Sequence, residues 1–171
     1  MMKGKKQPAR GRGKQKRRVL IVDDHAVLRE GLAMVINQQP DLVVCGEAED
    51  VPRALETISA VEPDAAIVDL SLMGGSGLDL INDIKARWPN LPTLVLSLHE
   101  ETLYAERCLR AGARGYIMKR ASTAEVLAAL RTVLSGGVHL SEKMASCARA
   151  WKATGRAPEQ PGADSDQRPT A

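Results

Sequence analysis

Two short apolar runs that each end in carboxylates constrain the fold of this chain more than any other feature. The run at residues 65–68 leads directly into Asp69, and the run at residues 19–22 leads into Asp23 and Asp24. Near-continuous apolar runs of this length are typical of parallel strands that helices cover on both faces. We therefore expect a buried sheet with carboxylates gathered at one edge.

The rest of the chain repeats this alternation. We expect five strands, at residues 19–23, 42–45, 65–69, 93–97 and 115–118. Stretches with apolar residues three and four apart follow each strand and predict five helices. One of these covers residues 101–111 and ends at Gly112, and another follows the capping box Ser122-Thr123-Ala124-Glu125. The pattern predicts a doubly wound α/β fold with a five-stranded parallel sheet, for which the flavodoxin-like order 2-1-3-4-5 is the natural choice.

Charge is distributed unevenly along the chain. Nine of the 24 Lys and Arg residues lie in residues 1–18, which contain no acid. The rest of the chain therefore has 15 basic residues and all 21 acidic ones, a net charge of −6. We interpret residues 1–17 as a basic disordered arm and residues 18–138 as an acidic domain, which by its charge is not a nucleic-acid binder. The arm either contacts nucleic acid or an acidic partner, or serves only as a solvating tail. Residues 139–151 predict a peripheral helix, and residues 152–171 a flexible linker or tail.

Composition also indicates the cellular compartment of the protein. No apolar stretch reaches the roughly 18 residues of a membrane span, and no apolar signal region follows the charged N-terminus. Three cysteines without C-x-x-C spacing fit a reducing compartment. We therefore expect a cytoplasmic protein with no membrane contact. The three histidines are scattered along the sequence, so we expect no zinc site.

The strand ends predict a shared site. In the order 2-1-3-4-5, the ends of the first and third strands bring Asp23, Asp24 and Asp69 into one crevice. Like charges about 4 Å apart repel by about 4 kcal/mol where the effective dielectric constant is about 20. The cluster therefore favours a neutralising cation, and a few oxygen ligands with room for water suit Mg²⁺. The alternative is a group of solvated acids at strand ends.

Two further polar side chains stand at strand ends. Ser97 closes the run at residues 93–97, and Lys119 follows the run at residues 115–118. A cation, an ammonium and a hydroxyl around one carboxylate suit the oxygens of a phosphoryl group. Asp69 would then act as the nucleophile and carry the group as an acyl phosphate. For Lys119, the alternative is a plain salt bridge.

These residues together resemble the receiver (CheY-like) domain of two-component response regulators. The matching positions are the acid pair Asp23-Asp24, the phospho-acceptor Asp69, the switch residues Ser97 and Tyr116, and Lys119. Segments 22–25, 69–72, 75–81 and 111–119 look most like the NarL/FixJ subclass, which carries a LuxR-type helix-turn-helix output. The resemblance covers about residues 17–140.

The resemblance implies a phospho-accepting switch. A sensor histidine kinase would phosphorylate Asp69, with Mg²⁺ held by Asp24, Asp69 and the backbone carbonyl of Ser71, and with Asp23 acting through water. Such a domain is a signalling switch rather than an enzyme, although self-phosphorylation and autodephosphorylation take place at Asp69.

The resemblance also implies how the signal leaves the site. Ser97 would bond a phosphoryl oxygen, Tyr116 would turn inward, and Lys119 would pair with the phosphate. Phosphorylation would then favour a homodimer. Ser71 and His99 would line the path of the hydrolytic water.

Other functions remain to be compared with this one. A haloacid-dehalogenase-type phosphatase also uses an Asp nucleophile, but it needs a second acid two residues later, where this chain has Ser71. No helix-turn-helix follows the receiver-like region. The chain is therefore either a piece of a transcription regulator, which binds DNA only through an output domain outside it, or a stand-alone receiver that acts by protein contact. The linker-like residues 152–171 favour the first.

Overall fold

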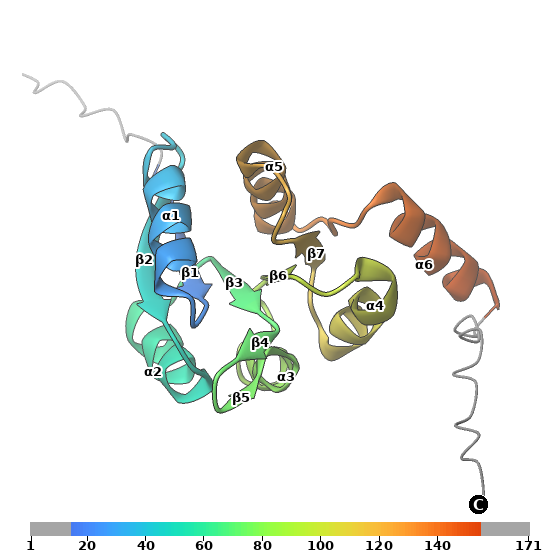
Figure 1. The fold of residues 1–171 in the computed structure, drawn as a ribbon, viewed down its shortest axis with the longest axis horizontal. Coiled ribbons are helices and arrows are strands. Elements are labelled where there is room, and N and C mark those ends of the chain that lie inside the picture. Colours follow the sequence, from blue (N-terminus) through green and yellow to red (C-terminus); the bar gives the residue numbers. More distant parts are fainter. Residues whose placement is uncertain (1–14, 155–171) are drawn as a thin grey trace, which may run out of the picture.

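A five-stranded parallel sheet in the order β2-β1-β3-β6-β7 forms the centre of the molecule (Figure 1). The structure is a computed structural model that describes residues 15–154. The strands are β1 (Arg17–Val22), β2 (Leu42–Ala48), β3 (Ala65–Asp69), β6 (Thr93–Ser97) and β7 (Gly115–Met118). Counted within this sheet alone, the order is 2-1-3-4-5, which confirms the predicted flavodoxin-like topology.

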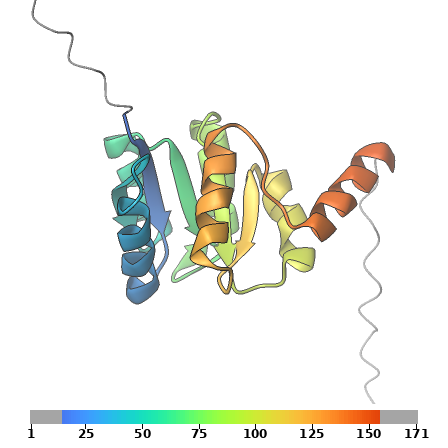
Figure 2. The same cartoon turned by 90° about the horizontal axis from the view of Figure 1, so that it is seen from above.

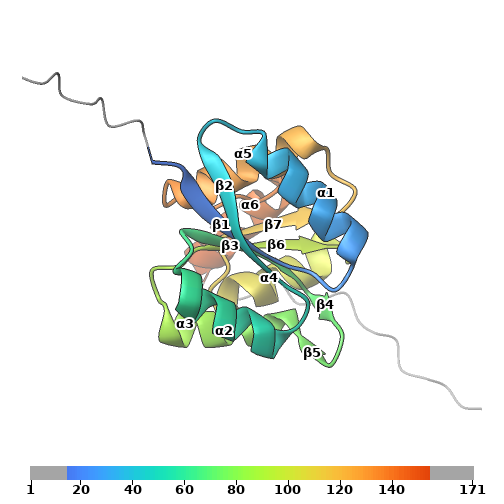
Figure 3. The ribbon, with the colours of Figure 1, turned by 90° about the vertical axis from the view of Figure 1, so that its left-hand side faces the viewer.

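Helices cover both faces of the sheet (Figure 3). Helices α1 (Ala26–Asn37) and α5 (Thr123–Leu134) lie on one face, and α2 (Val51–Val61), α3 (Gly77–Arg87) and α4 (Glu101–Ala111) lie on the other. One apolar cluster fills the α1–α5 side and includes Ile21 and Leu130, and a second fills the α2–α4 side and includes Leu20 and Ile84. Because successive strand residues point to opposite faces, these two clusters require strands that are apolar throughout.

Local sequence signals set several helix ends. The Asp50 side chain accepts a hydrogen bond from the backbone N–H of Arg53 at 2.8 Å and caps α2. Ser122 and Glu125 form the predicted capping box at the start of α5. Gly112 ends α4 with a φ of +115°, as expected of a C-cap glycine. Each device satisfies backbone groups that a helix end leaves without a partner.

Some element bounds differ from the prediction. β1 starts at Arg17, which the prediction assigned to the basic arm, and it ends before Asp23. β2 continues past Cys45 to Ala48. A small antiparallel hairpin of β4 (Ser71–Leu72) and β5 (Gly75–Ser76) stands where we expected only a loop. Two-residue strands have no apolar run of their own, so the sequence pattern does not reveal them.

The last helix, α6 (Glu142–Thr154), lies beside α4 at the end of the sheet (Figure 2). It begins after the predicted residue 139, because His139 instead forms a parallel bridge with Gly115 at the free edge of β7. The backbone N–H of Tyr116 donates to the His139 carbonyl at 3.1 Å, and Met144 is buried in the core cluster of the α4 side. No helix in residues 15–154 is long and apolar enough to cross a membrane. Residues 1–14 of the predicted arm and 155–171 of the predicted linker lie outside the described residues.

Gly77 lies directly against the end of β3. A Cβ at this position would collide with the backbone carbonyl of Asp69 and with the Cα of Leu70. The Gly77 N–H donates a hydrogen bond to the Leu70 carbonyl at 3.0 Å. Only glycine permits this close approach, which holds the start of α3 against the segment that follows Asp69.

Candidate functional site

Polar side chains from several strands meet at the C-terminal edge of the sheet. The register pairs Ile21 with Ile67, Ile67 with Leu94, and Leu96 with Ile117, so the ends of β1, β3, β6 and β7 lie nearly level. Because all these strands are parallel, the residues after their last apolar positions reach the same edge. The polar residues at this edge are Asp23, Asp24, Asp69, Ser97 and Lys119.

Asp69 and Lys119 form the buried ion pair at the centre of this edge. Lys119 Nζ donates a hydrogen bond to Asp69 Oδ2 at 2.9 Å and lies 3.0 Å from Asp23 Oδ2. Burial raises the pKa of Asp69, and the hydrogen bond from Lys119 offsets this only in part. Burial by itself would lower the pKa of Lys119, but the negative charges of the neighbouring Asp69 and Asp23 carboxylates raise it overall. Lys119 is therefore a fixed positive charge beside the candidate nucleophile.

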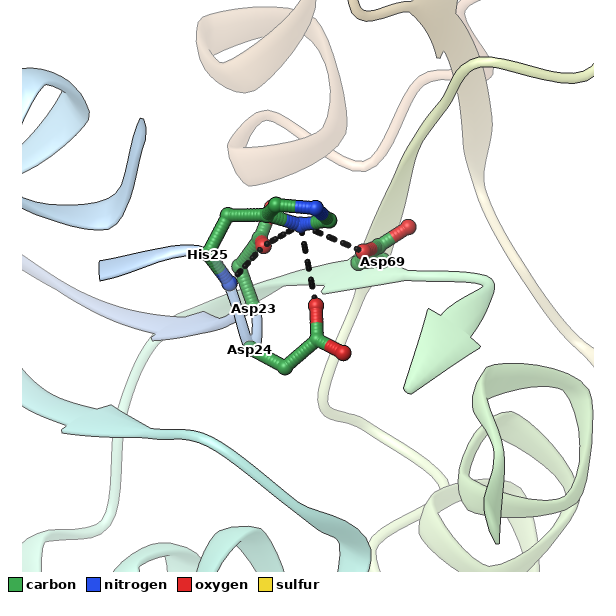
Figure 4. Close-up of side chains that lie close together, drawn as sticks. All are labelled: Asp23, Asp24, His25 and Asp69. Carbon is green, nitrogen blue, oxygen red and sulfur yellow. Dashed lines mark hydrogen bonds and ion pairs between the residues drawn. The ribbon is translucent and has the colours of Figure 1, made fainter. Parts of the chain in front are cut away.

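Asp23 and Asp24 complete an acidic cluster (Figure 4). Asp23 Oδ1 accepts a hydrogen bond from the backbone N–H of His25 at 2.8 Å, and Asp24 Oδ2 accepts one from the N–H of Met73 at 3.1 Å. Asp23 Oδ2 and Asp24 Oδ1 are buried, yet neither accepts a hydrogen bond from any residue that the structure describes. Their close neighbours are the cationic Lys119 and the ring of His25. Buried carboxylate oxygens without donors fit a bound divalent cation.

His25 also belongs to this cluster, although we did not predict it as a site residue. Its Nδ1 lies 3.1 Å from Asp23 Oδ1, 2.9 Å from Asp24 Oδ1 and 4.0 Å from Asp69 Oδ2 (Figure 4). One donor atom from each of these four residues lies within 4.8 Å of all the others. The only signal in the sequence was that His25 directly follows the acid pair.

Ser97 and Tyr116 are joined through the backbone of His99. The buried Ser97 hydroxyl accepts a hydrogen bond from the His99 N–H at 3.0 Å, and within residues 15–154 it forms none with the Asp69 side chain. The Tyr116 side chain is also buried, and its hydroxyl donates to the His99 carbonyl at 2.7 Å. Burial raises the pKa of Tyr116 to about 12. The structure therefore links the two predicted switch residues to each other rather than directly to Asp69.

Ser71 connects the segment after β3 to the one after β6. Its backbone N–H donates to Asp69 Oδ1 at 3.1 Å, and its hydroxyl lies 3.0 Å from His99 Nε2. The His99 ring contacts the Tyr104 ring of α4, with 4.6 Å between the ring centroids. A change at Asp69 can therefore reach α4 through Ser71 and His99.

Comparison with known proteins identifies the family. Residues 19–131 match the family described as the response regulator receiver domain, and the chain belongs to this family. The chain is 37% identical over 128 residues to the oxygen regulatory protein NreC of Staphylococcus carnosus, covering 74% of this chain and 59% of that protein. It is 29% identical over 126 residues to the transcriptional regulatory protein DegU of Brevibacillus brevis, covering 74% of this chain and 53% of that protein. The chain thus spans little more than half the length of these relatives.

A solved structure supports the same assignment. A two-component response regulator of the LuxR family from Aurantimonas sp. SI85-9A1 superimposes with a TM-score of 0.74 and 28% identity, over 81% of this chain and 99% of that chain. The expected membership in the receiver family, with relatives in the LuxR group, is confirmed. Members of this family are signalling switches rather than enzymes in the usual sense.

Proposed function

We propose that Asp69 accepts a phosphoryl group from the phosphohistidine of a sensor histidine kinase. The observation that carries this proposal is the buried Asp69 carboxylate with the Lys119 ammonium 2.9 Å from one of its oxygens. In the transfer, an Asp69 oxygen bonds to phosphorus while the bond from phosphorus to the histidine nitrogen breaks. The nitrogen keeps the electron pair and takes up a proton, and Asp69 becomes an acyl phosphate.

A divalent cation belongs to the same proposal. Mg²⁺ would be held by Asp24, Asp69 and the backbone carbonyl of Ser71, with Asp23 acting through a water molecule. The support is the pair of buried Asp23 and Asp24 oxygens that accept no hydrogen bond within the described part of the chain. The bound ion supplies positive charge against the repulsion between these acids and the phosphoryl oxygens. Lys119 holds a phosphoryl oxygen from the other side of Asp69.

Ser97 and Tyr116 transmit the change. The Ser97 oxygen accepts a bond from the His99 N–H, so its own proton remains available for a phosphoryl oxygen. Moving Ser97 toward phosphorylated Asp69 breaks its bond with His99. Because the His99 carbonyl holds the Tyr116 hydroxyl, this motion also alters the contact that keeps Tyr116 in place. The face formed by α4 and β7 is repacked as a result.

The output of the switch is the regulation of transcription. The support is the description of the relative DegU as a transcriptional regulatory protein, and of a structural neighbour as a LuxR-family response regulator. DNA would be bound by an output domain of the complete protein and not by the receiver domain. A phosphorylation-dependent homodimer would bring two such output domains together.

A direct labelling experiment tests the acceptor. The protein is incubated with acetyl phosphate and Mg²⁺, and its intact mass is measured. The wild type gains the mass of one phosphoryl group, and Asp69→Asn gains none. Asp79→Asn, which changes an exposed acid in the first turn of α3, is the matched control and is labelled like the wild type. Labelling of Asp69→Asn to the wild-type extent contradicts the assignment.

A further inference from the structure

We propose that His25 supplies a nitrogen ligand to the cation at this site, so that the site selects first-row transition ions such as Mn²⁺ and Co²⁺ over Mg²⁺. The inference rests on the proposed function, because it extends the metal site described there. In this shell Asp23 binds the ion directly instead of through the water molecule proposed for Mg²⁺, and the donor set becomes Asp23, Asp24, His25 and Asp69. This set differs from one made only of oxygen atoms, and the difference changes the class of ion that is preferred.

The distances around His25 Nδ1 fit a coordination shell. In a six-coordinate shell with metal–ligand bonds of about 2.1 Å, adjacent donor atoms lie about 3 Å apart and opposite ones about 4 Å apart. His25 Nδ1 lies 2.9 Å from Asp24 Oδ1 and 3.1 Å from Asp23 Oδ1, which match adjacent positions. Its separation of 4.0 Å from Asp69 Oδ2 matches opposite positions. Figure 4 shows the ring facing all three carboxylates.

Hydrogen bonding does not account for every one of these contacts. Asp24 Oδ1 is buried and only 2.9 Å from His25 Nδ1, yet it accepts no hydrogen bond from any group in residues 15–154. Asp23 is 1% exposed, and its Oδ2 also accepts no hydrogen bond from the described residues. Its one ion-pair contact there is with Lys119. Two ligand atoms that bind the same metal ion lie about this close together, although no hydrogen bond joins them.

The chemistry of the imidazole determines the ion. Carboxylate, carbonyl and water ligands suit Mg²⁺, whereas imidazole nitrogen suits first-row transition ions, with affinity rising from Mn²⁺ to Co²⁺ and beyond. The His25 side chain is 61% exposed, so the ring is accessible to an ion that arrives from solvent. Its backbone N–H is fixed to Asp23 Oδ1 at 2.8 Å, which keeps the residue beside the acids.

Calorimetric titration of the whole chain with Mg²⁺, Mn²⁺ and Co²⁺ tests the proposal. The wild type is expected to bind Co²⁺ at least about tenfold more tightly than Mg²⁺, and His25→Ala to lose about tenfold in Co²⁺ affinity while its Mg²⁺ affinity stays nearly constant. His139→Ala removes a histidine at the β7 edge and keeps the wild-type preference. The visible spectrum of bound Co²⁺ adds a signature of nitrogen ligation, which His25→Ala changes and His139→Ala does not.

Two results overturn the inference. If His25→Ala keeps the wild-type ratio of Co²⁺ affinity to Mg²⁺ affinity, the ring is only a hydrogen-bond donor to the acids. If His25→Ala binds all three ions more tightly, the ring competes with the ion for its position. Because the His25 ring is mostly exposed, its loss leaves the core unchanged.

A separate variant tests whether the acidic cluster binds a metal ion at all. Asp24→Asn should weaken all three ions together. A wild type that binds no divalent ion contradicts the metal role in the proposed function, and this inference with it. A wild type that binds Mg²⁺ and accepts a phosphoryl group, but shows no preference that depends on His25, contradicts this inference alone.

Discussion

The Lys119 ammonium reaches from the end of β7 to the Asp69 carboxylate at the end of β3, with 2.9 Å between Nζ and Oδ2. The two side chains are only 7% and 2% exposed, so the pair is shielded from solvent. β6 separates the two strands in the sheet, and the contact therefore depends on the strand order. Removing Lys119 leaves the Asp69 and Asp23 carboxylates buried without their cation, which links the chemistry of the site to its stability.

Replacing Lys119 by Met should lower the free energy of unfolding by about 3 kcal/mol, because Asp23 and Asp69 would remain buried without their cation. Urea denaturation at neutral pH measures the loss. Lys143→Met is the control, since Lys143 is exposed on α6. A loss below about 1 kcal/mol would place this pair with ordinary surface ion pairs and contradict the role given to Lys119.

Replacing Asp69 by Asn should stabilise the protein at neutral pH, by an amount on the order of 1 kcal/mol. Burial raises the pKa of Asp69 above its ordinary value of 3.8, so the Asp69 carboxyl group binds its proton more tightly in the folded state than in the unfolded state. Wild-type stability therefore falls as the pH rises from 3.8 through the raised pKa, and the variant lacks this loss. Urea denaturation over a pH series should show the advantage of Asp69→Asn shrinking toward acid pH. An advantage that does not depend on pH would argue against a buried charge as its cause.

Divalent cations should stabilise the folded protein. An ion present at about 100 times its dissociation constant adds about 2.7 kcal/mol when it binds only the folded state. Thermal unfolding with and without Mg²⁺ measures the effect, and a chelator should reverse it. Asp24→Asn should abolish the gain, whereas the exposed-acid variant Asp79→Asn should keep it. An equal gain in wild type and Asp24→Asn would show that the ion binds elsewhere.

Removing the Tyr116 hydroxyl should cost about 1 kcal/mol, because Tyr116→Phe loses the hydrogen bond that this hydroxyl donates to the His99 carbonyl. Burial raises the pKa of Tyr116 to about 12, so the hydroxyl stays protonated and the cost should be the same from mildly acidic to mildly alkaline pH. Urea denaturation at several pH values checks both statements. Tyr104→Phe, which keeps the ring contact with His99, serves as the comparison. A cost that changes across this pH range would be inconsistent with a neutral hydroxyl donor.

Truncating Met144 should loosen α6 without unfolding the sheet. Met144 is 5% exposed in the core cluster of the α4 side, so Met144→Ala removes the buried contact that attaches this helix. Hydrogen exchange should accelerate in residues 139–154 and stay slow in β1, β3 and β6, because α6 opens as a separate unit. Lys143→Ala on the same helix is the control. Uniform acceleration across the whole domain would instead place α6 within the cooperative core.

The sequence predicted the sheet well because its strands are buried on both faces. Their apolar runs are distinct from the helical spacing between them, and the rules of parallel connection then leave few strand orders. Helix ends with a side-chain signal, such as Asp50 and the Ser122–Glu125 capping box, were also predictable. The β4–β5 hairpin and the bridge at His139 were not, because backbone pairing of single residues has no periodic pattern.

The site was predictable only as far as strand ends determine it. Asp23, Asp24 and Asp69 meet because their strands are neighbours, and their donor atoms lie within 4.8 Å together with that of His25. The inclusion of His25 depends on the direction of its ring after β1 ends. The links from His99 to Ser97 and Tyr116 depend on the backbone of the segment after β6. Neither ring direction nor loop geometry follows from residue type and spacing.

The contact between Gly77 and the end of β3 affects how genetic data on this protein should be interpreted. Any side chain at position 77 pushes against the backbone that carries Asp69, so under the proposed function we expect substitutions there to silence signalling as fully as substitutions at Asp69. A mutational scan scored by reporter output alone would group these two positions together, although Gly77 has no reactive atoms. A parallel measurement of protein abundance separates them, since losses at position 77 lower the level of folded protein and Asp69→Asn does not.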